Sequence, residues 1–289
     1  MQMPDRYCVI GHPIAHSRSP WIHTRFAHMV GHNIVYTAEE SPLEGFATTV
    51  QQLRTQGLKG ANVTVPFKLQ AYALAQQHSD RATLAQAANT LYWQDDGTLY
   101  ADNTDGLGLV RDITVNAGQT LQGQRILLLG AGGASAGVLG ELLAQRPALV
   151  VVANRTVSKA EALVAQHQTC AQTYAVALEA CTLDAVTQND SPLPAFDVII
   201  NGTASSLSGQ ALLLPPARVA PQALLYDMMY GAAAMAFLQQ APTLHARARD
   251  GLGMLVEQAA AAFALWRGVT PGTCSVLHAL RQLVSQPQE

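Results

Sequence analysis

The feature that most constrains the fold is a run of four aliphatic residues followed directly by a glycine-rich turn. Residues 126–129 read Ile-Leu-Leu-Leu, which predicts a strand buried on both faces of a parallel sheet. Residues 130–135 read Gly-Ala-Gly-Gly-Ala-Ser, and apolar residues with helical spacing follow between Val138 and Leu143. Strand, glycine turn and helix in this order predict an α/β domain, in which amides at the start of the helix can bind an anion.

The same turn nearly matches the dinucleotide fingerprint G-x-G-x-x-G. Gly130 and Gly132 take the first two glycine positions, whereas Ser135 stands at the third. Two interpretations stay open from the turn alone. It is either a nucleotide site or a structural connection between strand and helix.

Composition limits the class of protein. The 289 residues suffice for about two domains, and 49% hydrophobic with 13% charged residues is typical of a packed globular chain. A net charge of −3 without a basic run gives no indication of nucleic-acid binding. The four cysteines lack metal-ligand spacing, and neither a signal peptide nor a membrane span is recognisable. We expect a cytoplasmic protein without a metal site, with no nucleic-acid or membrane partner.

A pair of serines precedes the first predicted helix. Ser19 followed by Pro20 is typical of a helix N-cap and first turn. Ser17 has no such local role in the sequence. With Arg18 between them, the two hydroxyls could hold a small anion such as a carboxylate.

A lysine follows the end of another predicted strand. Residues 60–65 alternate as a strand does, and Pro66 suits the first position of a helix, which places Lys68 in the first helical turn. A cation is disfavoured there because the N-terminal end of the helix dipole is positive. This broken local rule favours a functional lysine over a solvent-facing one.

An acidic and amide cluster follows a predicted hairpin, whose strands are residues 91–93 and 99–101. Asp102 is interpreted as a cap of the helix expected over 107–117, and Asp105 as a carboxylate that faces a cleft. Farther along, Gln258 lies within an apolar helix. A buried amide needs a partner, which is either a ligand or a core hydrogen bond.

The strand expected over residues 148–153 ends without the acid that binds the ribose of NAD. Arg155 and Lys159 follow instead and suit a 2′-phosphate, which favours NADP. Thr156 is also a candidate N-cap for the next helix. Further strands are predicted over 196–201 and 223–227, each with small or polar residues at its carboxyl end, where open α/β sheets bind ligands.

Five motifs in order resemble the shikimate dehydrogenase family nearly from end to end. They are Pro-Ile-Ala-His-Ser-Arg-Ser-Pro at 13–20, Gly-Ala-Asn-Val-Thr-Val-Pro-Phe-Lys at 60–68, Ala-Asn-Thr at 88–90, Asp-Asn-Thr-Asp-Gly at 102–106 and Asp-Gly-Leu-Gly-Met at 250–254.

The resemblance implies a role for each matching residue. It implies that Lys68 and Asp105 are the catalytic pair. It implies that Ser17 and Ser19 bind a substrate carboxylate. The residues implied in binding the ring hydroxyls are Asn62, Thr64, Asn89 and Gln258, and Tyr230 is implied to lie beside them. Residues implied in NADP binding are Asp80, Gly130, Ala131, Gly132, Gly133, Ala134, Asn154, Arg155, Thr156, Lys159, Met228 and Gly251.

Three positions depart from the family pattern. Arg18 replaces a more common lysine, and Ser135 replaces a glycine. Residues 201–205 read Asn-Gly-Thr-Ala-Ser, where Asn-Ala-Thr-Ser is more usual. The last difference concerns the contacts expected near the nicotinamide.

The resemblance implies a two-domain α/β enzyme. We expect residues 1–105 with 252–289 to form a substrate-binding catalytic domain with a mostly parallel sheet, and residues 106–251 to form a Rossmann-type doubly wound domain for NADP. The implied reaction is the reversible NADPH-dependent reduction of 3-dehydroshikimate to shikimate in chorismate and aromatic amino-acid biosynthesis, by a monomer or homodimer. The alternatives are a quinate/shikimate dehydrogenase that uses NAD and a catalytically silent NADP-binding sensor.

Overall fold

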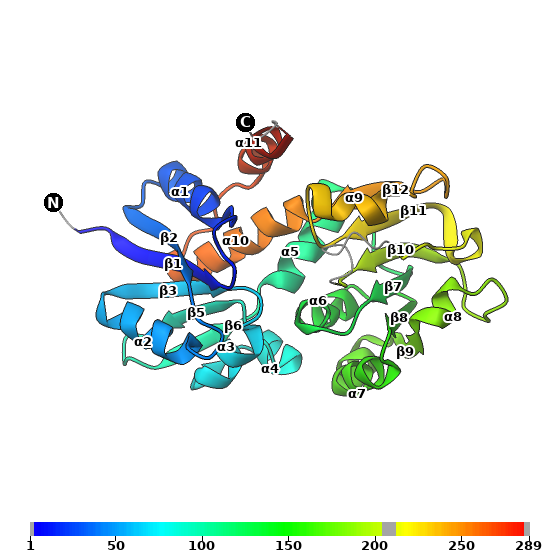
Figure 1. Cartoon of the computed structure of the whole chain (residues 1–289), viewed down its shortest axis with the longest axis horizontal. Coiled ribbons are helices and arrows are strands. Elements are labelled where there is room, and N and C mark those ends of the chain that lie inside the picture. Colours follow the sequence, from blue (N-terminus) through cyan, green and yellow to red (C-terminus); the bar gives the residue numbers. More distant parts are fainter. Residues whose placement is uncertain (1–2, 204–211, 286–289) are drawn as a thin grey trace. The chain divides into compact units, whose positions relative to one another are not determined.

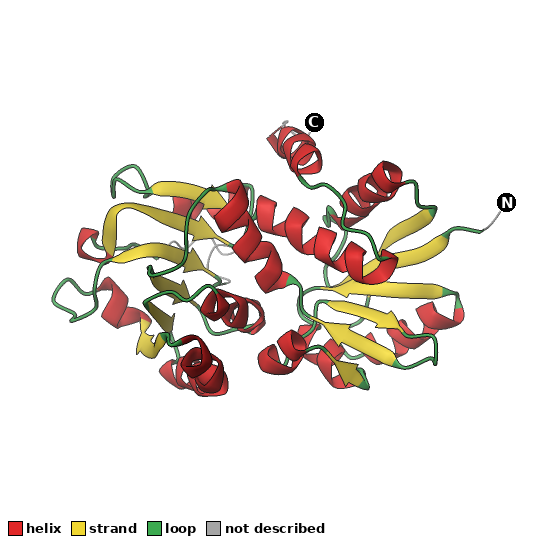
Figure 2. Cartoon of the chain, turned by 180° about the vertical axis from the view of Figure 1, so that it is seen from behind, coloured by secondary structure: helices red, strands yellow, loops and turns green. Residues whose placement is uncertain are grey.

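The computed structural model of the chain describes residues 3–203 and 212–285 (Figures 1 and 2). It divides into two compact units, Met1–Gly108 with Leu255–Glu289 and Leu109–Met254. The chain thus passes between the units twice, each time within a helix, first in α5 (Asp105–Arg111) and again in α10 (Leu252–Arg267). The domain boundaries predicted from the sequence, after residues 105 and 251, each lie three residues before those of the structure.

The first unit is built on a six-stranded sheet of order β2-β1-β3-β5-β6-β4. Its pairings are parallel except at β5, which runs antiparallel to both neighbours, as the predicted hairpin requires. The strands are β1 (Asp5–Gly11), β2 (Ile34–Glu40), β3 (Leu58–Val63), β4 (Gln77–His78), β5 (Thr90–Trp93) and β6 (Leu99–Asp102). Besides α5 and α10, the helices are α1 (Ser19–Val30), α2 (Phe46–Thr55), α3 (Lys68–Leu74), α4 (Asp80–Ala85) and α11 (Cys274–Ser285).

Strand β1 is buried on both faces because alternate side chains enter two different cores. Cys8 and Ile10 pack with residues of α2 and α3, among them Phe46. Tyr7 and Val9 face the opposite side, where Trp266 of α10 packs against them. The C-terminal part of the chain is therefore needed to complete the core of the first unit.

The second unit is a parallel six-stranded sheet of order β12-β11-β10-β7-β8-β9. This is the doubly wound order, and its switch point lies between β7 and β10, where ligands bind in such sheets. The strands are β7 (Arg125–Leu129), β8 (Leu149–Asn154), β9 (Ala177–Thr182), β10 (Phe196–Asn201), β11 (Val219–Asp227) and β12 (Arg247–Asp250). The helices are α6 (Gly133–Ala144), α7 (Val157–Tyr174), α8 (Leu183–Thr187) and α9 (Ala232–Leu238), with a 3-10 turn at Pro216–Arg218.

Both faces of this second sheet are covered by helices (Figures 1 and 2). Ile126 and Leu128 pack with residues of α6 and α7, whereas Leu127 and Leu129 pack on the side of α8 and α9. The uninterrupted aliphatic run of β7 is explained by this two-sided burial.

Three local predictions were wrong. The helix expected over 107–117 begins at Asp105 and changes to π geometry over Asp112–Asn116. The N-cap of α1 is Arg18, and Ser19 is already helical. Asp102 does not cap α5, because its carboxylate accepts hydrogen bonds from Ser79 and Arg81.

Candidate active site

The loop before α1 brings its two serines into contact. The Ser17 hydroxyl accepts a hydrogen bond from the backbone N–H of Ser19 at 3.3 Å, so Ser17 has the local role that its sequence did not suggest. The side chain of Ser19 is buried and lies near the hydroxyl of Tyr36 of β2. Ser17 is half-buried and Ser19 is buried, so the pair does not lie at an exposed loop tip.

Asn62 lies near the end of β3 and is buried. Its Nδ2 donates to the carbonyl oxygen of Asn89 and to the hydroxyl of Thr90, both at 3.2 Å, and its Oδ1 accepts from the hydroxyl of Tyr36 at 2.8 Å. Thr64 follows one residue after β3, and its methyl group packs where a side chain on Gly11 would lie. The contacts of Asn62 therefore hold it in one orientation.

Asn89 is the centre of the cluster and is 3% exposed. Its Nδ2 lies 2.9 Å from Oδ1 of Asp105, 3.0 Å from Oγ1 of Thr104 and 3.2 Å from Oε1 of Gln258. Its Oδ1 accepts from the backbone N–H of Thr104 at 2.9 Å. One amide thus joins β5, the start of α5 and α10.

Lys68 and Asp105 form an ion pair between the first residues of α3 and α5. The Lys68 ammonium donates to Oδ2 of Asp105, while the other carboxylate oxygen accepts from Asn89. The Asp105 side chain is 8% exposed and that of Lys68 is 18% exposed. A cation at the start of a helix is unfavourable by itself, and the adjacent carboxylate offsets this cost.

Gln258 is satisfied within the first unit. Its Oε1 faces Asn89, and its Nε2 donates to the carbonyl oxygen of Leu255 at 2.9 Å. A continuous set of hydrogen bonds, one of them an ion pair, therefore connects five predicted residues, namely Asn62, Asn89, Asp105, Lys68 and Gln258. Lysine, carboxylate, amides and hydroxyls form a polar site for a small molecule with several oxygens.

The predicted nucleotide turn lies in the second unit, between β7 and α6. Gly130 has φ +100°, and a Cβ there would lie 3.1 Å from the backbone of Gly202. By contrast, a Cβ on Gly132 or Gly133 would meet open space. Packing within the protein therefore does not require glycine at these two positions, whereas close approach of a ligand to the backbone does.

Asn154 connects this turn to the next strand-to-helix loop. Its Oδ1 accepts from the backbone N–H of Ala131 at 3.3 Å, and its Nδ2 donates to the carbonyl of Thr156 at 2.8 Å. Arg155 and Lys159 are both exposed. Thr156 occupies the N-cap position of α7, but its hydroxyl makes no capping bond within the described part of the chain. Two exposed cations and a helix start are suited to a phosphate group.

The remaining predicted residues lie outside both the polar cluster and the glycine turn. Gly251 must be glycine for packing, since a Cβ there would lie 2.2 Å from the carbonyl oxygen of Met228. Tyr230 follows β11 in the second unit, so the unit with the polar cluster does not contain it. Asp80 is exposed as the first residue of α4 in the first unit, apart in the chain from the glycine turn. Ala204 and Ser205, which belong to the departing 201–205 segment, lie outside the described residues.

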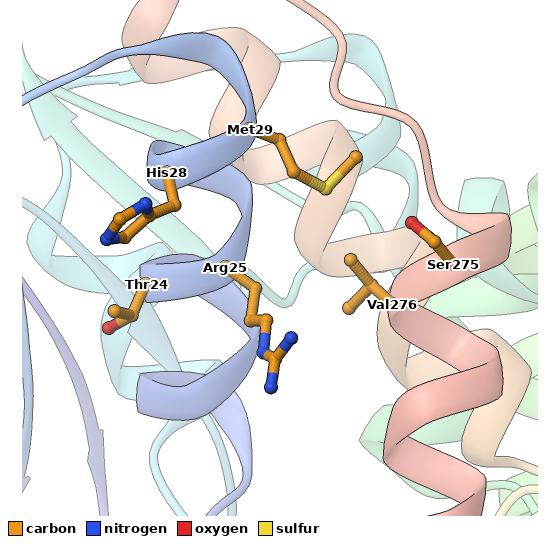
Figure 3. A pocket seen from close by; sticks show the side chains of 6 residues that line it. All are labelled: Thr24, Arg25, His28, Met29, Ser275 and Val276. Atoms are coloured by element: carbon orange, nitrogen blue, oxygen red, sulfur yellow. The ribbon is translucent and has the colours of Figure 1, made fainter.

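A mostly apolar groove of about 510 Å³ lies elsewhere in the first unit, between α1 and α11 (Figure 3). Arg25 and Met29 extend from α1 toward Ser275 and Val276 of α11. It contains no residue of the predicted site.

Sequence reasoning missed some residues of the cluster. Tyr36 sits in an ordinary strand pattern, and its link to Asn62 spans 26 residues. Thr104 carried a signal, because it directly precedes Asp105 in the acidic and amide motif. The sequence carried no signal for the buried ion pair between Asp112 and Arg249 in the second unit. The hydroxyl of Tyr226 also donates a hydrogen bond to Asp112.

The described residues contain no group of three or more acidic, histidine or cysteine side chains placed to hold a metal. All four cysteines are free. Over the same part of the chain, every helix is too short or too polar to cross a membrane.

Three family profiles match the chain in order. Their descriptions are shikimate dehydrogenase substrate binding domain, over residues 9–91, shikimate / quinate 5-dehydrogenase, over 112–209, and shikimate 5′-dehydrogenase C-terminal domain, over 251–281. The sequence is 53% identical over 278 residues to the shikimate dehydrogenase (NADP(+)) of Paracidovorax citrulli (strain AAC00-1), covering 96% of this chain and 97% of that protein. It is also 53% identical over 281 residues to the enzyme of that name from Acidovorax sp. (strain JS42), covering 97% of each.

Solved structures are similar to this chain over nearly its whole length. An Ael1 enzyme from Pseudomonas putida superposes with a TM-score of 0.84 at 42% identity, covering 99% of this chain and 100% of that one. The shikimate 5-dehydrogenase of Thermus thermophilus, in complex with NADP(H) and shikimate, superposes with a TM-score of 0.80 at 29% identity, covering 96% and 99%.

Proposed function

Because this chain belongs to the shikimate dehydrogenase family, we propose that it interconverts 3-dehydroshikimate and shikimate with NADP(H), using Lys68 and Asp105 as its catalytic pair. The observation that carries the assignment of residues is the ion pair between Lys68 and Asp105, joined to the amides of Asn89 and Gln258. The product enters the biosynthesis of chorismate and the aromatic amino acids.

Lys68 is the acid in the direction of ketone reduction. Negative charge develops on the ketone oxygen as hydride reaches the carbonyl carbon, and the Lys68 ammonium gives that oxygen a proton. In the reverse direction its amine removes the hydroxyl proton. Proton transfer of this kind contributes about 10²- to 10⁴-fold to a rate.

Asp105 keeps the lysine and the substrate in position. Its Oδ2 accepts the hydrogen bond from Lys68, and Asn89 fixes its Oδ1, so the carboxylate cannot rotate freely. Ser17 and Ser19 bind the substrate carboxylate, and Asn62, Thr64, Asn89 and Gln258 bind its hydroxyls, with Tyr230 beside them. Fixing several oxygens at once orients the reacting carbon.

NADP(H) supplies or accepts the hydride when it is bound. The residues that would hold it are those of the glycine turn at 130–134, where Gly132 and Gly133 leave room for a pyrophosphate. Asn154, Arg155, Thr156 and Lys159 would hold the 2′-phosphate and adenosine side, and Asp80, Met228 and Gly251 would make further contacts. Domain roles follow from this division, the first unit binding substrate and the second NADP.

The test is a steady-state assay of shikimate and quinate, each with NADP⁺ and NAD⁺, followed by absorbance of the reduced nicotinamide. We expect shikimate with NADP⁺ to be the preferred pair. Lys68→Ala should lower kcat by about 10²- to 10⁴-fold with little change in shikimate affinity. Lys59→Ala, which removes an exposed lysine of β3, is the matched control and should be unchanged.

Other outcomes have clear meanings. A preference for NAD⁺ would contradict the role given to Arg155, and a preference for quinate would contradict the substrate. A wild-type protein that binds NADP⁺ without turnover would be a cofactor-binding sensor. Full activity of Lys68→Ala would remove the lysine from the mechanism.

We also propose a cytoplasmic monomer or homodimer that needs no nucleic-acid or membrane partner. Light scattering coupled to size-exclusion chromatography should give the mass of one or two chains of 30.7 kDa.

A further inference from the structure

A buried asparagine to which the proposed function gives no role lies beside the proposed catalytic pair. Asn103 follows β6 and is 0% exposed. Its Oδ1 accepts from the backbone N–H of Asp105 at 3.1 Å, and its Nδ2 donates to the carbonyl oxygen of Ala87 at 3.0 Å. One amide therefore joins the residue that carries the proposed carboxylate to the loop of residues 87–89, which precedes β5.

The two contacts of Asn103 require the same orientation of its amide. Only the NH₂ end can donate to the carbonyl of Ala87, and only the oxygen can accept from the N–H of Asp105. A flipped amide would place two oxygens against each other at one contact and two donors at the other. Because both ends of the amide bind backbone and the residue has no exposed surface, Asn103 can act on the reaction only through its neighbours.

The same loop also contacts Lys68. The N–H of Ala88, which is 0% exposed, donates to the carbonyl oxygen of Lys68 at 2.9 Å. The next residue in the loop, Asn89, places its Nδ2 2.9 Å from Oδ1 of Asp105. The loop thus holds the backbone of Lys68 directly and the backbone of Asp105 through Asn103.

The spacing of the pair depends on these backbone contacts. Lys68 and Asp105 are the first residues of α3 and α5, so the place of each side chain depends on where its helix begins. The N–H of Asp105 is one of the first four of its helix, which have no partner within the helix itself. Loss of the Asn103 amide would release that N–H and allow the start of α5 to shift.

We propose that Asn103 is a positioning residue for the reaction, whose amide sets the spacing of Lys68 and Asp105 by joining the start of α5 to the loop of residues 87–89. The inference rests on the proposed function of this site. It does not require Asn103 to touch the substrate. Its effect passes through the backbone of Asp105, whereas Asn89 holds the carboxylate itself.

Asn103→Ala removes both hydrogen bonds. We expect kcat for shikimate oxidation to fall by about tenfold or more, since a shift of about 1 Å at a reacting group can cost about a hundredfold in rate. The KM for NADP⁺ should stay unchanged. A residue with a merely structural role would lower the melting temperature but leave kcat of the folded protein unchanged. A wild-type kcat in Asn103→Ala would overturn the proposal.

Asn103→Ser is a milder variant that keeps the test decisive if Asn103→Ala does not fold. A serine hydroxyl can accept from the N–H two residues farther on, but it is too short to reach Ala87 as well. We expect its kcat to lie below that of wild type and above that of Asn103→Ala. Because the proposal requires the link to Ala87, a wild-type kcat in Asn103→Ser would contradict it.

Asp96→Ala is the matched control. Oδ1 of Asp96 accepts from the backbone N–H of Thr98 at 2.8 Å, which is the same contact between residues two apart, at the exposed tip of the β5–β6 hairpin. Its removal should leave kcat unchanged. A loss as large as that of Asn103→Ala would refute a specific role for Asn103.

A double-mutant cycle tests whether the effect passes through Asp105. In an Asp105→Asn background, Asn103→Ala should lower kcat by less than about twofold, since the carboxylate whose position it sets is absent. An undiminished effect in that background would contradict the proposed route.

Crystal structures of wild type and Asn103→Ala separate this proposal from the proposed function, because they need no turnover. In the variant, we expect the Lys68 ammonium and the Asp105 carboxylate to lie beyond the limit of about 4 Å for an ion pair. A wild type that does not oxidise shikimate would refute the proposed function and leave this measurement valid. An intact ion pair in Asn103→Ala would refute the positioning role alone.

Discussion

His23 is buried with both ring nitrogens lacking a hydrogen-bond partner among the described residues. Burial lowers its pKa from the ordinary 6.5 to about 3. The folded chain therefore keeps it neutral, whereas the unfolded chain takes up a proton below pH 6.5. Its contribution to stability is present above pH 6.5 and is lost toward pH 3, at up to about 1.4 kcal/mol per pH unit.

His23→Phe should remove this acid sensitivity while keeping an aromatic ring against Tyr36. We expect the fall in the free energy of unfolding from pH 7.5 to pH 5 to be about 2 kcal/mol smaller in the variant than in the wild type. Urea unfolding at both pH values measures it. His28→Phe, at an exposed histidine of the same helix, is the control and should behave like wild type. Identical pH dependence in His23→Phe and wild type would show that His23 is not the group responsible.

Single-residue predictions succeeded where the cause is local in the chain. Lys68 lies in the first turn of α3, as predicted, but the helix begins at Lys68 itself, so Pro66 precedes the N-cap Phe67 and is not the first helical residue. Predictions at Ser19 and Asp102 failed because their partners are distant. Ser19 lies near Tyr36 of the next strand, and Asp102 accepts hydrogen bonds from Ser79 and Arg81. Capping rules consider only neighbours in the chain and cannot predict such contacts.

At the scale of elements, the two departures from the family pattern in the second unit are one feature. Ser135 lies in the first turn of α6 and Gly202 directly after β10. A Cβ on Gly202 would lie 2.7 Å from Oγ of Ser135. The glycine therefore accommodates the hydroxyl that replaces the third glycine of the fingerprint.

Gly202→Ala should destabilise the protein by about 1–3 kcal/mol, because the added methyl group meets Oγ of Ser135 in a close-packed region. Ser135→Ala alone should be nearly neutral, since its buried hydroxyl has no partner among the described residues. The double variant should recover most of the loss, and chemical denaturation of the four proteins gives the coupling. Purely additive effects would refute the pairing.

Strands were predictable where two cores bury them. β7, β8 and β10 carry uninterrupted aliphatic runs because helices cover both faces. β12, with the sequence Arg-Ala-Arg-Asp, and β9, which has exposed positions, lie at the edges of the sheet and have no such run. The π segment at Asp112–Asn116 also escapes periodicity, because its Asp112 is fixed by Arg249 and Tyr226, far along the chain.

At the scale of the whole molecule, the two proposed ligand sites belong to different units. Shikimate alone should slow amide hydrogen exchange in residues 60–68 and 102–108 of the first unit, because ligand binding suppresses local opening. NADP⁺ alone should slow exchange at residues 130–135 and 154–159 of the second. Mass-spectrometric exchange with each ligand separately measures this. Protection of residues 154–159 by shikimate alone would contradict the assignment of the sites to units.

The fold class was predictable because two independent patterns in the sequence indicate the same architecture. Aliphatic strands with polar carboxyl ends indicate a doubly wound sheet, and ordered motifs at both ends of the chain indicate a first unit closed by its last helices. Hydrogen bonds between distant segments, such as that from Asn89 to Gln258 across 169 residues, needed the structure.

The return of the chain to the first unit has a consequence for biosynthesis. A ribosome delivers Leu109–Met254 as one continuous stretch, so the nucleotide unit can fold as soon as it emerges. The substrate unit cannot, since Gln258 and Trp266, which complete its polar cluster and core, are made only after the nucleotide unit. Its first strands must wait, with their Trp266-facing surface uncovered, until the last helices arrive. The nucleotide unit, which lies between the two parts of the substrate unit in the chain, can therefore be complete before the substrate unit is.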